Sequence, residues 1–224
     1  IDKLMARTAK RPIVTGVISK TSATVFATII GTISLLIFWM FTTPLAALLA
    51  LIAISFYVFV YTMALKRRTS QNIVWGGAAG CMPVLIGWAA VTNSLSLTAL
   101  AFFMVIFFWT PPHFWSLAIK YKDDYSAAGI PMLPVVATKA RVHKEMWFHT
   151  IMMIACSIWL IISAGLAMWS MVVTVLLGLV FARELLALKE GSENYSKTAA
   201  KIFQWSITYL SLFSVVLVVA QLSA

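Results

Sequence analysis

Charged residues are scarce in this sequence. Asp, Glu, Lys and Arg make up 11% of the 224 residues, whereas hydrophobic residues make up 62% and the mean hydropathy is +0.94. A soluble domain has about a quarter of its residues charged, because most of its surface faces water. The scarcity of charge therefore excludes an ordinary soluble domain and indicates a polytopic membrane protein.

Cysteine is almost absent as well. Cys81 and Cys156 both lie inside apolar segments, and they form neither a disulfide framework nor a metal-binding spacing. We expect both to be small packing residues.

The sequence also lacks an initiator Met: it begins at Ile1, and Asp2 follows directly. We therefore expect an N-terminal part of a longer protein to be missing.

Long apolar segments account for most of the chain. Seven of them have about twenty residues, enough to cross the roughly 30 Å of hydrocarbon in a bilayer. We therefore expect an all-α transmembrane helical bundle that forms one domain over residues 1–224. The predicted spans are 21–41, 44–64, 72–92, 96–119, 147–167, 168–188 and 201–222.

The charged residues all fall on one side of this topology. All 17 Lys and Arg and all 7 acids lie in or beside the segments 1–20, 65–71, 120–146 and 189–200. The positive-inside rule makes that side cytoplasmic. We expect a multi-pass protein of the inner cell membrane with its C-terminus outside. The net charge of +10 then reflects topology and anionic lipid, and we expect no nucleic-acid partner.

Acidic residues among the basic ones need another explanation, because acids contribute little to orientation. Carboxylates bind hard cations through oxygen, while Lys and Arg contact phosphate oxygens. A polar face with both signs therefore suggests a site that binds Mg²⁺ together with a diphosphate.

The densest polar cluster lies at the end of the fourth span and just beyond it, in the stretch 109–135. Charged groups at a membrane boundary are costly, so such a cluster is a functional-site hypothesis. The alternative is a solvated loop with interfacial aromatic residues, and Gly129, Pro131 and Pro134 argue against a regular helix there. The cluster contains His113, Trp115, Lys120, Tyr121, Lys122, Asp123, Asp124 and Tyr125.

Two other segments combine basic and small residues. Arg7 and Arg11 are four apart and would share a helical face, which suits an anion or a lipid headgroup equally well. Lys66 and Arg67 belong to a basic triplet at the end of the second span, which alone would be a stop-transfer anchor. The segment GGAAGCMP at 76–83 permits close helix packing or leaves room for a bulky ligand.

Several stretches together resemble a known family. They are similar to the haem-specific branch of the UbiA-type membrane prenyltransferases, the protohaem IX farnesyltransferases or haem O synthases. The C-terminal AKIFQWSITYL resembles the last span of that family, so the likeness covers nearly the whole chain. The internal stretches are IDKLMARTAKRP at 1–12, YTMALKRRTSQNIVWGGAAGCMPVLIGWAAVT at 61–92 and TPPHFWSLAIKYKDDYSAAGIPMLPVV at 110–136.

The resemblance implies nine transmembrane helices, two of them upstream of Ile1, around a cavity that polar cytoplasmic loops cap. Asp2 matches the last acid of the first family motif, N-x-x-x-D-x-x-x-D. Asp123 and Asp124 lie in K-D-D-Y, the form of the second acidic motif that marks the haem branch. These three acids would be catalytic and would hold Mg²⁺.

The basic residues are expected to bind the diphosphate. Lys66 and Arg67 match a basic pair that contacts this group in related prenyltransferases, and Arg7, Lys120 and Lys122 would assist them.

The reaction implied is transfer of farnesyl from farnesyl diphosphate to a vinyl group of haem B, in the lipid bilayer. Addition of water gives haem O for haem–copper terminal oxidases, with a haem A synthase or an oxidase as the handover partner.

His113 would contact haem, or it would form a hydrogen bond to backbone groups that Pro111 and Pro112 leave without a helical partner. His143 and His149 are expected at the surface or at the membrane interface. The haem and prenyl pocket would contain His113, Trp115, Tyr121 and Tyr125.

Three alternatives fit the sequence less well. A UbiA-type enzyme for a quinone precursor or another aromatic acceptor disagrees with K-D-D-Y and T-P-P-H-F-W. A carrier or channel would place charges near the bilayer midplane, and no Asp, Glu, Lys or Arg falls near the middle of a predicted span. A structural subunit of a respiratory complex would need no acidic loop motifs.

Overall fold

Long helices make up the protein, and the predicted all-α class is confirmed. The computed structural model describes residues 2–4 and 8–223, and within these residues it contains helices and no strand. Seven helical stretches are long and apolar enough to cross a membrane. They are α2 (Lys20–Phe41), α3 (Pro44–Ser55) continued by the π-helix η2 (Phe56–Leu65), α4 (Asn72–Thr92), α5 (Leu97–Lys120), α8 (Lys139–Ser163), α9 (Met168–Leu186) and α10 (Tyr195–Leu222).

Four short helices of the described chain lie at the polar end, two before α2 and two between α5 and α8. They are η1 (Asp2–Leu4), α1 (Pro12–Thr15), α6 (Lys122–Ala127) and α7 (Leu133–Val136). The predicted loop 120–146 is therefore wrong in part. It contains α6 and α7, and α8 begins at Lys139, within that loop.

The helix boundaries follow from local sequence. Four of the long helices begin just after a Ser or Thr whose hydroxyl accepts a hydrogen bond from the backbone N–H three residues later. These residues are Ser19 before α2, Thr43 before α3, Ser96 before α5 and Thr138 before α8. Such caps satisfy donors that a helix N-terminus leaves free. Gly165, just after α8, has a φ of 65°, a left-handed conformation that ends a helix.

Helices α8 and α10 begin earlier than the sequence predicted, at Lys139 and Tyr195 instead of 147 and 201. A hydropathy window detects only the part of a helix that lies in hydrocarbon. Both helices continue beyond that part, and the extensions contain Lys and Arg residues.

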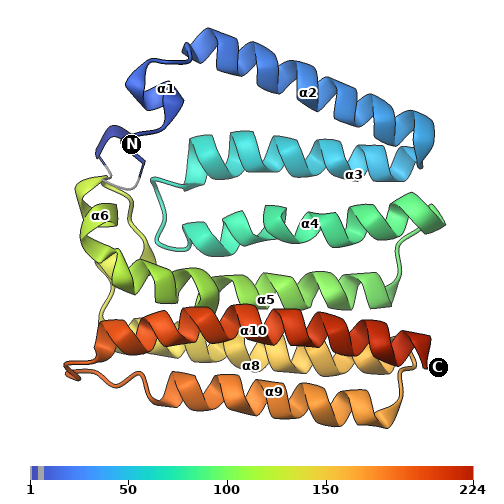
Figure 1. The fold of residues 1–224 in the computed structure, drawn as a ribbon, viewed down its shortest axis with the longest axis vertical. Helices are drawn as coiled ribbons and strands as arrows, with labels where there is room; N and C mark the ends of the chain where they lie inside the picture. Colours follow the sequence, from blue (N-terminus) through green and yellow to red (C-terminus); the bar gives the residue numbers. More distant parts are fainter. Residues whose placement is uncertain (1, 5–7, 224) are drawn as a thin grey trace.

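Polar segments gather at one end of the bundle. In Figure 1 the N-terminus, α6, and the connections before α4 and before α10 lie at one end. The turns α2–α3, α4–α5 and α8–α9 lie at the other end, together with the C-terminus. This arrangement agrees with a topology in which the charged segments share one side.

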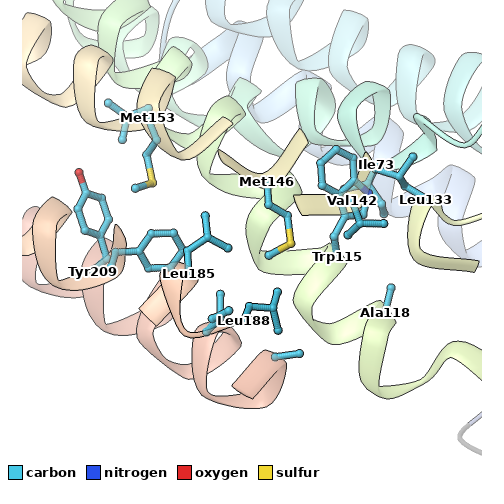
Figure 2. Close-up of a cluster of buried hydrophobic side chains, with 14 of the residues drawn as sticks. Ile73, Trp115, Ala118, Leu133, Val142, Met146, Met153, Leu185, Leu188 and Tyr209 are labelled. Carbon is cyan, nitrogen blue, oxygen red and sulfur yellow. The ribbon is translucent and has the colours of Figure 1, made fainter. Parts of the chain in front are cut away.

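The core lies in the C-terminal half, where α5 packs against α8 and α10. Figure 2 shows Met146, Met153, Leu185 and Tyr209 in this cluster. By contrast, α2 has no buried residue and α3 buries only three alanines. The α2–α3 side of the bundle therefore buries few side chains within the described part of the chain.

Candidate functional site

A small polar pocket lies at the polar end of the bundle, between the N-terminal segment, η2, α4 and α6. Its volume is about 160 Å³. It brings together both signs of charge from parts of the chain that are far apart in sequence. Its lining residues are Asp2, Thr8, Arg11, Tyr61, Lys66, Asn72, Ile73, Phe114, Tyr125, Ile130 and Met132.

Asp2 is oriented by its own segment. Arg11 Nη1 donates to Asp2 Oδ2 at 2.9 Å, and the Thr8 hydroxyl donates to the Asp2 backbone oxygen at 2.8 Å. The ion pair is partly exposed, so it positions the carboxylate more than it stabilises the fold. Sequence reasoning selected Arg7 for the anion, but Arg7 lies outside the described residues.

Lys66 lines the pocket because η2 is a π-helix. Its hydrogen bonds join residues five apart, as from Lys66 N–H to Tyr61 O at 2.8 Å. At about 4.4 residues per turn, Tyr61 and Lys66 lie about 50° apart around the axis, whereas an α-helix would separate them by about 140°. Tyr57 shares this face, and its ring centroid lies 5.4 Å from that of Tyr61. Arg67 is exposed and does not line the pocket.

Asn72, at the start of α4, has an unpartnered polar atom. Its side chain is fully buried, and its Nδ2 donates to the Lys66 backbone oxygen at 3.2 Å. Its Oδ1 is buried and has no hydrogen-bond partner within the described part of the chain. Since buried polar atoms in native proteins are nearly always paired, this exception needs an explanation.

A larger apolar pocket adjoins the polar one, between α3, η2, α4 and α5. Its volume is about 580 Å³. Tyr61, Ile73 and Phe114 line both pockets, and we call these three residues the collar. The other lining residues are Ala53, Ile54, Tyr57, Val58, Gly76, Gly77, Ala79, Gly80, Ile106, Trp109 and Thr110.

Glycines of α4 shape the apolar pocket in two ways. A Cβ at Gly76 would lie 2.7 Å from the Tyr61 ring, and a Cβ at Gly77 would lie 3.0 Å from Thr110 Cγ2. A Cβ at Gly80 would meet nothing within 4 Å. The small-residue segment therefore permits close packing at its start and leaves open space one turn further on.

The two acids of α6 lie outside this lining. Asp123 is exposed and Asp124 is half-buried, although Tyr125 of the same helix lines the polar pocket. The described residues contain no group of three or more His, Cys, Asp or Glu side chains that could hold a metal ion. A shared metal site of Asp2, Asp123 and Asp124 is therefore not preformed here, and their role as ligands stays a prediction.

The other predicted residues near α6 are also outside both pockets. Lys120 and Lys122 are exposed, and Lys120 Nζ lies 5.4 Å from the Tyr121 ring centroid. Trp115 is fully buried and belongs to the core, near Val142 and Leu133 (Figure 2). Its position favours packing, whereas the roles of the two lysines and Tyr121 stay predictions.

His113 is fixed between aromatic rings. Its ring stacks on Trp109 and Phe203, with centroid distances of 4.2 and 4.5 Å. Ser206 Oγ donates to Phe203 O at 2.6 Å, so His113 Nδ1–H donates to Ser206 Oγ at 2.7 Å. The expected bond to proline-freed backbone is thus replaced by a side-chain partner on α10. The tautomer leaves the lone pair on Nε2.

The surface position that the sequence suggested for His149 was wrong. His149 is buried, and its Nδ1–H donates to the Glu145 backbone oxygen at 2.8 Å. It lies on the part of α8 that faces α5, close to the rings of Phe108 and Trp115. A polar residue beside a basic segment suggested the surface, but the helical register turns this side chain inward.

Sequence reasoning missed Tyr61, Asn72 and the Arg11 pairing. The position of Tyr61 depends on a π-helical register, which hydropathy does not reveal. Asn72 did offer a signal, because it is an amide at the start of an apolar span, directly after a basic triplet.

Comparisons with known proteins agree with the earlier resemblance. Residues 1–218 match the UbiA prenyltransferase family. The chain is 48% identical to the protoheme IX farnesyltransferase of Paenarthrobacter aurescens, over 98% of this chain and 69% of the relative. It is 49% identical to the protein of the same name from Pseudarthrobacter chlorophenolicus, over 98% of this chain and 70% of the relative. It is 53% identical to the Mycobacterium avium protein of that name, over 74% of this chain and 54% of the relative. No solved structure matches.

The π-helical register gives a test by changing chain length. Deleting Met63, which is 70% exposed, shortens the Tyr61–Lys66 spacing to four, which keeps both on one face of an α-helix. Inserting an alanine after Met63 makes the spacing six, which suits neither helix type. We expect the deletion to keep the affinity for inorganic pyrophosphate within a few-fold and the insertion to lower it by about tenfold or more.

Isothermal titration calorimetry in detergent measures both affinities, and melting temperatures control for folding. Equal loss of pyrophosphate binding in two well-folded variants would contradict the role of the register.

Proposed function

Because this chain belongs to the UbiA prenyltransferase family, we propose that it transfers a farnesyl group from farnesyl diphosphate to a vinyl group of haem B, giving haem O. The haem acceptor rests on relatives named protoheme IX farnesyltransferase. The observation that supports this reaction best is the joining of a charged pocket to an apolar one at the collar. Such a pair of pockets suits a substrate with an anionic head and a long hydrocarbon chain.

The polar pocket would hold the diphosphate. Lys66 and Arg11 supply positive charge there, and charge-assisted hydrogen bonds to phosphate oxygens are the strong ones. Arg11 also orients Asp2, so one segment offers a cation and a carboxylate to the same ligand. Lys120, Lys122, Arg7 and Arg67 remain further candidates for this role.

Mg²⁺ is part of this proposal, and the donor set fits it. Mg²⁺ takes oxygen ligands and is usually held by one or two carboxylates plus substrate phosphates, so a protein site with few carboxylates is suitable. Asp2 lines the pocket, and Asp123 and Asp124 lie on the helix that contributes Tyr125. When bound, Mg²⁺ would neutralise charge that grows on the leaving diphosphate.

Bond cleavage would take place at the collar. The farnesyl C1–O bond breaks, and its electron pair leaves with the diphosphate toward Lys66. The allylic cation then lies beside the rings of Tyr61 and Phe114, whose faces attract positive charge. A vinyl carbon of haem B forms the new bond to C1. The resulting cation takes up water and loses a proton, which leaves the hydroxyl of the product.

The apolar pocket would hold the farnesyl chain beside Gly76 and Gly80. Removing hydrocarbon from water favours this placement. Of the predicted haem contacts, His113 offers Nε2, since Nδ1 bonds to Ser206.

The membrane context is proposed from charge. Positive-inside orientation places the polar end of the bundle in the cytoplasm of a bacterial cell. The product would pass to a haem A synthase or a terminal oxidase.

The reaction is tested by analysing haem from membranes of a host that lacks its own haem O synthase and expresses the full-length protein. Mass spectrometry is expected to find a haem heavier than haem B by a hydrated farnesyl group. Lys66→Met should lower its formation by about 10²–10³-fold, as for loss of a group that stabilises developing negative charge. Arg68→Met is the matched control, because Arg68 is an exposed basic residue that lines neither pocket, and it should retain haem O formation within a few-fold.

Haem B alone from well-inserted wild-type protein would refute the haem assignment. If both variants lost haem O formation to the same extent, the specific role of Lys66 in stabilising the leaving diphosphate would be refuted.

The apolar pocket is tested by filling it. Gly80→Leu should place a side chain in the farnesyl space and lower the ratio of kcat/KM for farnesyl over geranyl diphosphate by about tenfold or more, because each methylene in an apolar pocket contributes to discrimination. Gly87→Leu is the matched control. A Cβ at Gly87 also meets nothing within 4 Å, but Gly87 lines a separate pocket near Trp88.

The two ratios are measured with purified variants in detergent. The placement of the prenyl chain beside Gly80 would be contradicted if the farnesyl-to-geranyl ratio of kcat/KM stayed unchanged in Gly80→Leu. It would also be contradicted if Gly87→Leu changed that ratio by the same factor.

A further inference from the structure

The side-chain amide of Asn72 is locked in one orientation. Its Nδ2 donates to the Lys66 backbone oxygen at 3.2 Å. Rotating the amide by half a turn would place Oδ1 against that oxygen, and two acceptors would then face each other without a proton. Oδ1 therefore keeps its position, buried and without a partner in the described structure, on a residue that lines the polar pocket.

The chemistry of this atom limits what it can bind. A carbonyl oxygen only accepts hydrogen bonds, and the oxygens of a diphosphate are acceptors as well, so the substrate anion cannot satisfy it. Two donors of the pocket already have partners, since Arg11 Nη1 bonds to Asp2 Oδ2 and the Thr8 hydroxyl bonds to Asp2 O. A hard divalent cation is suited to this position, because it prefers carboxylate and amide oxygens.

We propose that Asn72 Oδ1 is a ligand of the divalent cation that binds with the diphosphate in the polar pocket, alongside the Asp2 carboxylate. The inference rests on the proposed function in that it takes diphosphate as the anion. A neutral amide ligand adds no negative charge next to the substrate phosphates, so it binds the metal without repelling them. Its bond to Lys66 O also ties the metal ligand to the residue that contacts the leaving group.

The test is direct metal binding, with Mn²⁺ as the probe and inorganic pyrophosphate present, followed by electron paramagnetic resonance. Asn72→Leu should weaken Mn²⁺ binding by at least about tenfold, a loss seen even for partners outside the ligand shell. Asn72→Asp, which keeps an oxygen at this position, should bind Mn²⁺ as tightly as wild type or more tightly. Gln71→Leu is the matched control, because the neighbouring amide lines neither pocket and should leave binding unchanged.

Two results would overturn the inference. One is unchanged Mn²⁺ affinity in Asn72→Leu. The other is an equal loss of metal-free pyrophosphate binding, measured by calorimetry, because Asn72 would then act only through the position of Lys66. If the leucine variant does not fold, Asn72→Asp decides, and a loss of about tenfold in its Mn²⁺ affinity would overturn the inference.

Haem O formation by the wild-type protein separates this inference from the proposed function. If the wild-type protein makes haem O but Asn72→Leu binds Mn²⁺ as well as wild type does, the role of Asn72 as a metal ligand is rejected and the proposed function stands. If the Mn²⁺ affinities follow the prediction but the wild-type protein makes no haem O, haem B is rejected as the acceptor and the metal ligand stands.

Discussion

Backbone hydrogen bonding inside the hydrocarbon layer is the constraint on which this site depends. No water is available there, so each N–H and C=O must find a partner within the helix. In Phe56–Leu65 the chain meets this requirement with bonds between residues five apart. The wider turn aligns Tyr57, Tyr61 and Lys66, and Asn72 at the start of α4 bonds to the Lys66 carbonyl oxygen. An α-helix would meet the same requirement but would turn Lys66 away.

The collar divides charge from hydrocarbon at one level of the bundle. Lys66 and Arg11 lie on one side of Tyr61, Ile73 and Phe114, and the glycines of α4 lie on the other. In the proposed reaction the leaving group departs toward fixed positive charge, where preorganised electrostatics lower the barrier. The cation stays among aromatic rings in a region from which water is excluded. The same division explains why an apolar bundle needs so few charged residues to act on a diphosphate.

The apolar runs were enough to predict seven spans, and the one-sided charge predicted the polar end where Asp2, Lys66 and Tyr125 meet. Features set by packing were not predictable in this way. Hydropathy does not report the register of η2, the inward turn of His149, or the early starts of α8 and α10. The acids of α6 show the limit of motif reasoning: their spacing matched the family, but Asp123 is exposed and neither acid lines the pocket.

The most direct test of one continuous site is an experimental structure of the protein with Mg²⁺ and the slowly reacting analogue farnesyl thiodiphosphate. The account predicts phosphate oxygens next to Lys66, and a prenyl chain that passes Tyr61 and Phe114 toward Gly80. A diphosphate bound instead between Lys120, Lys122 and the two acids of α6, with its chain outside the collar, would contradict it.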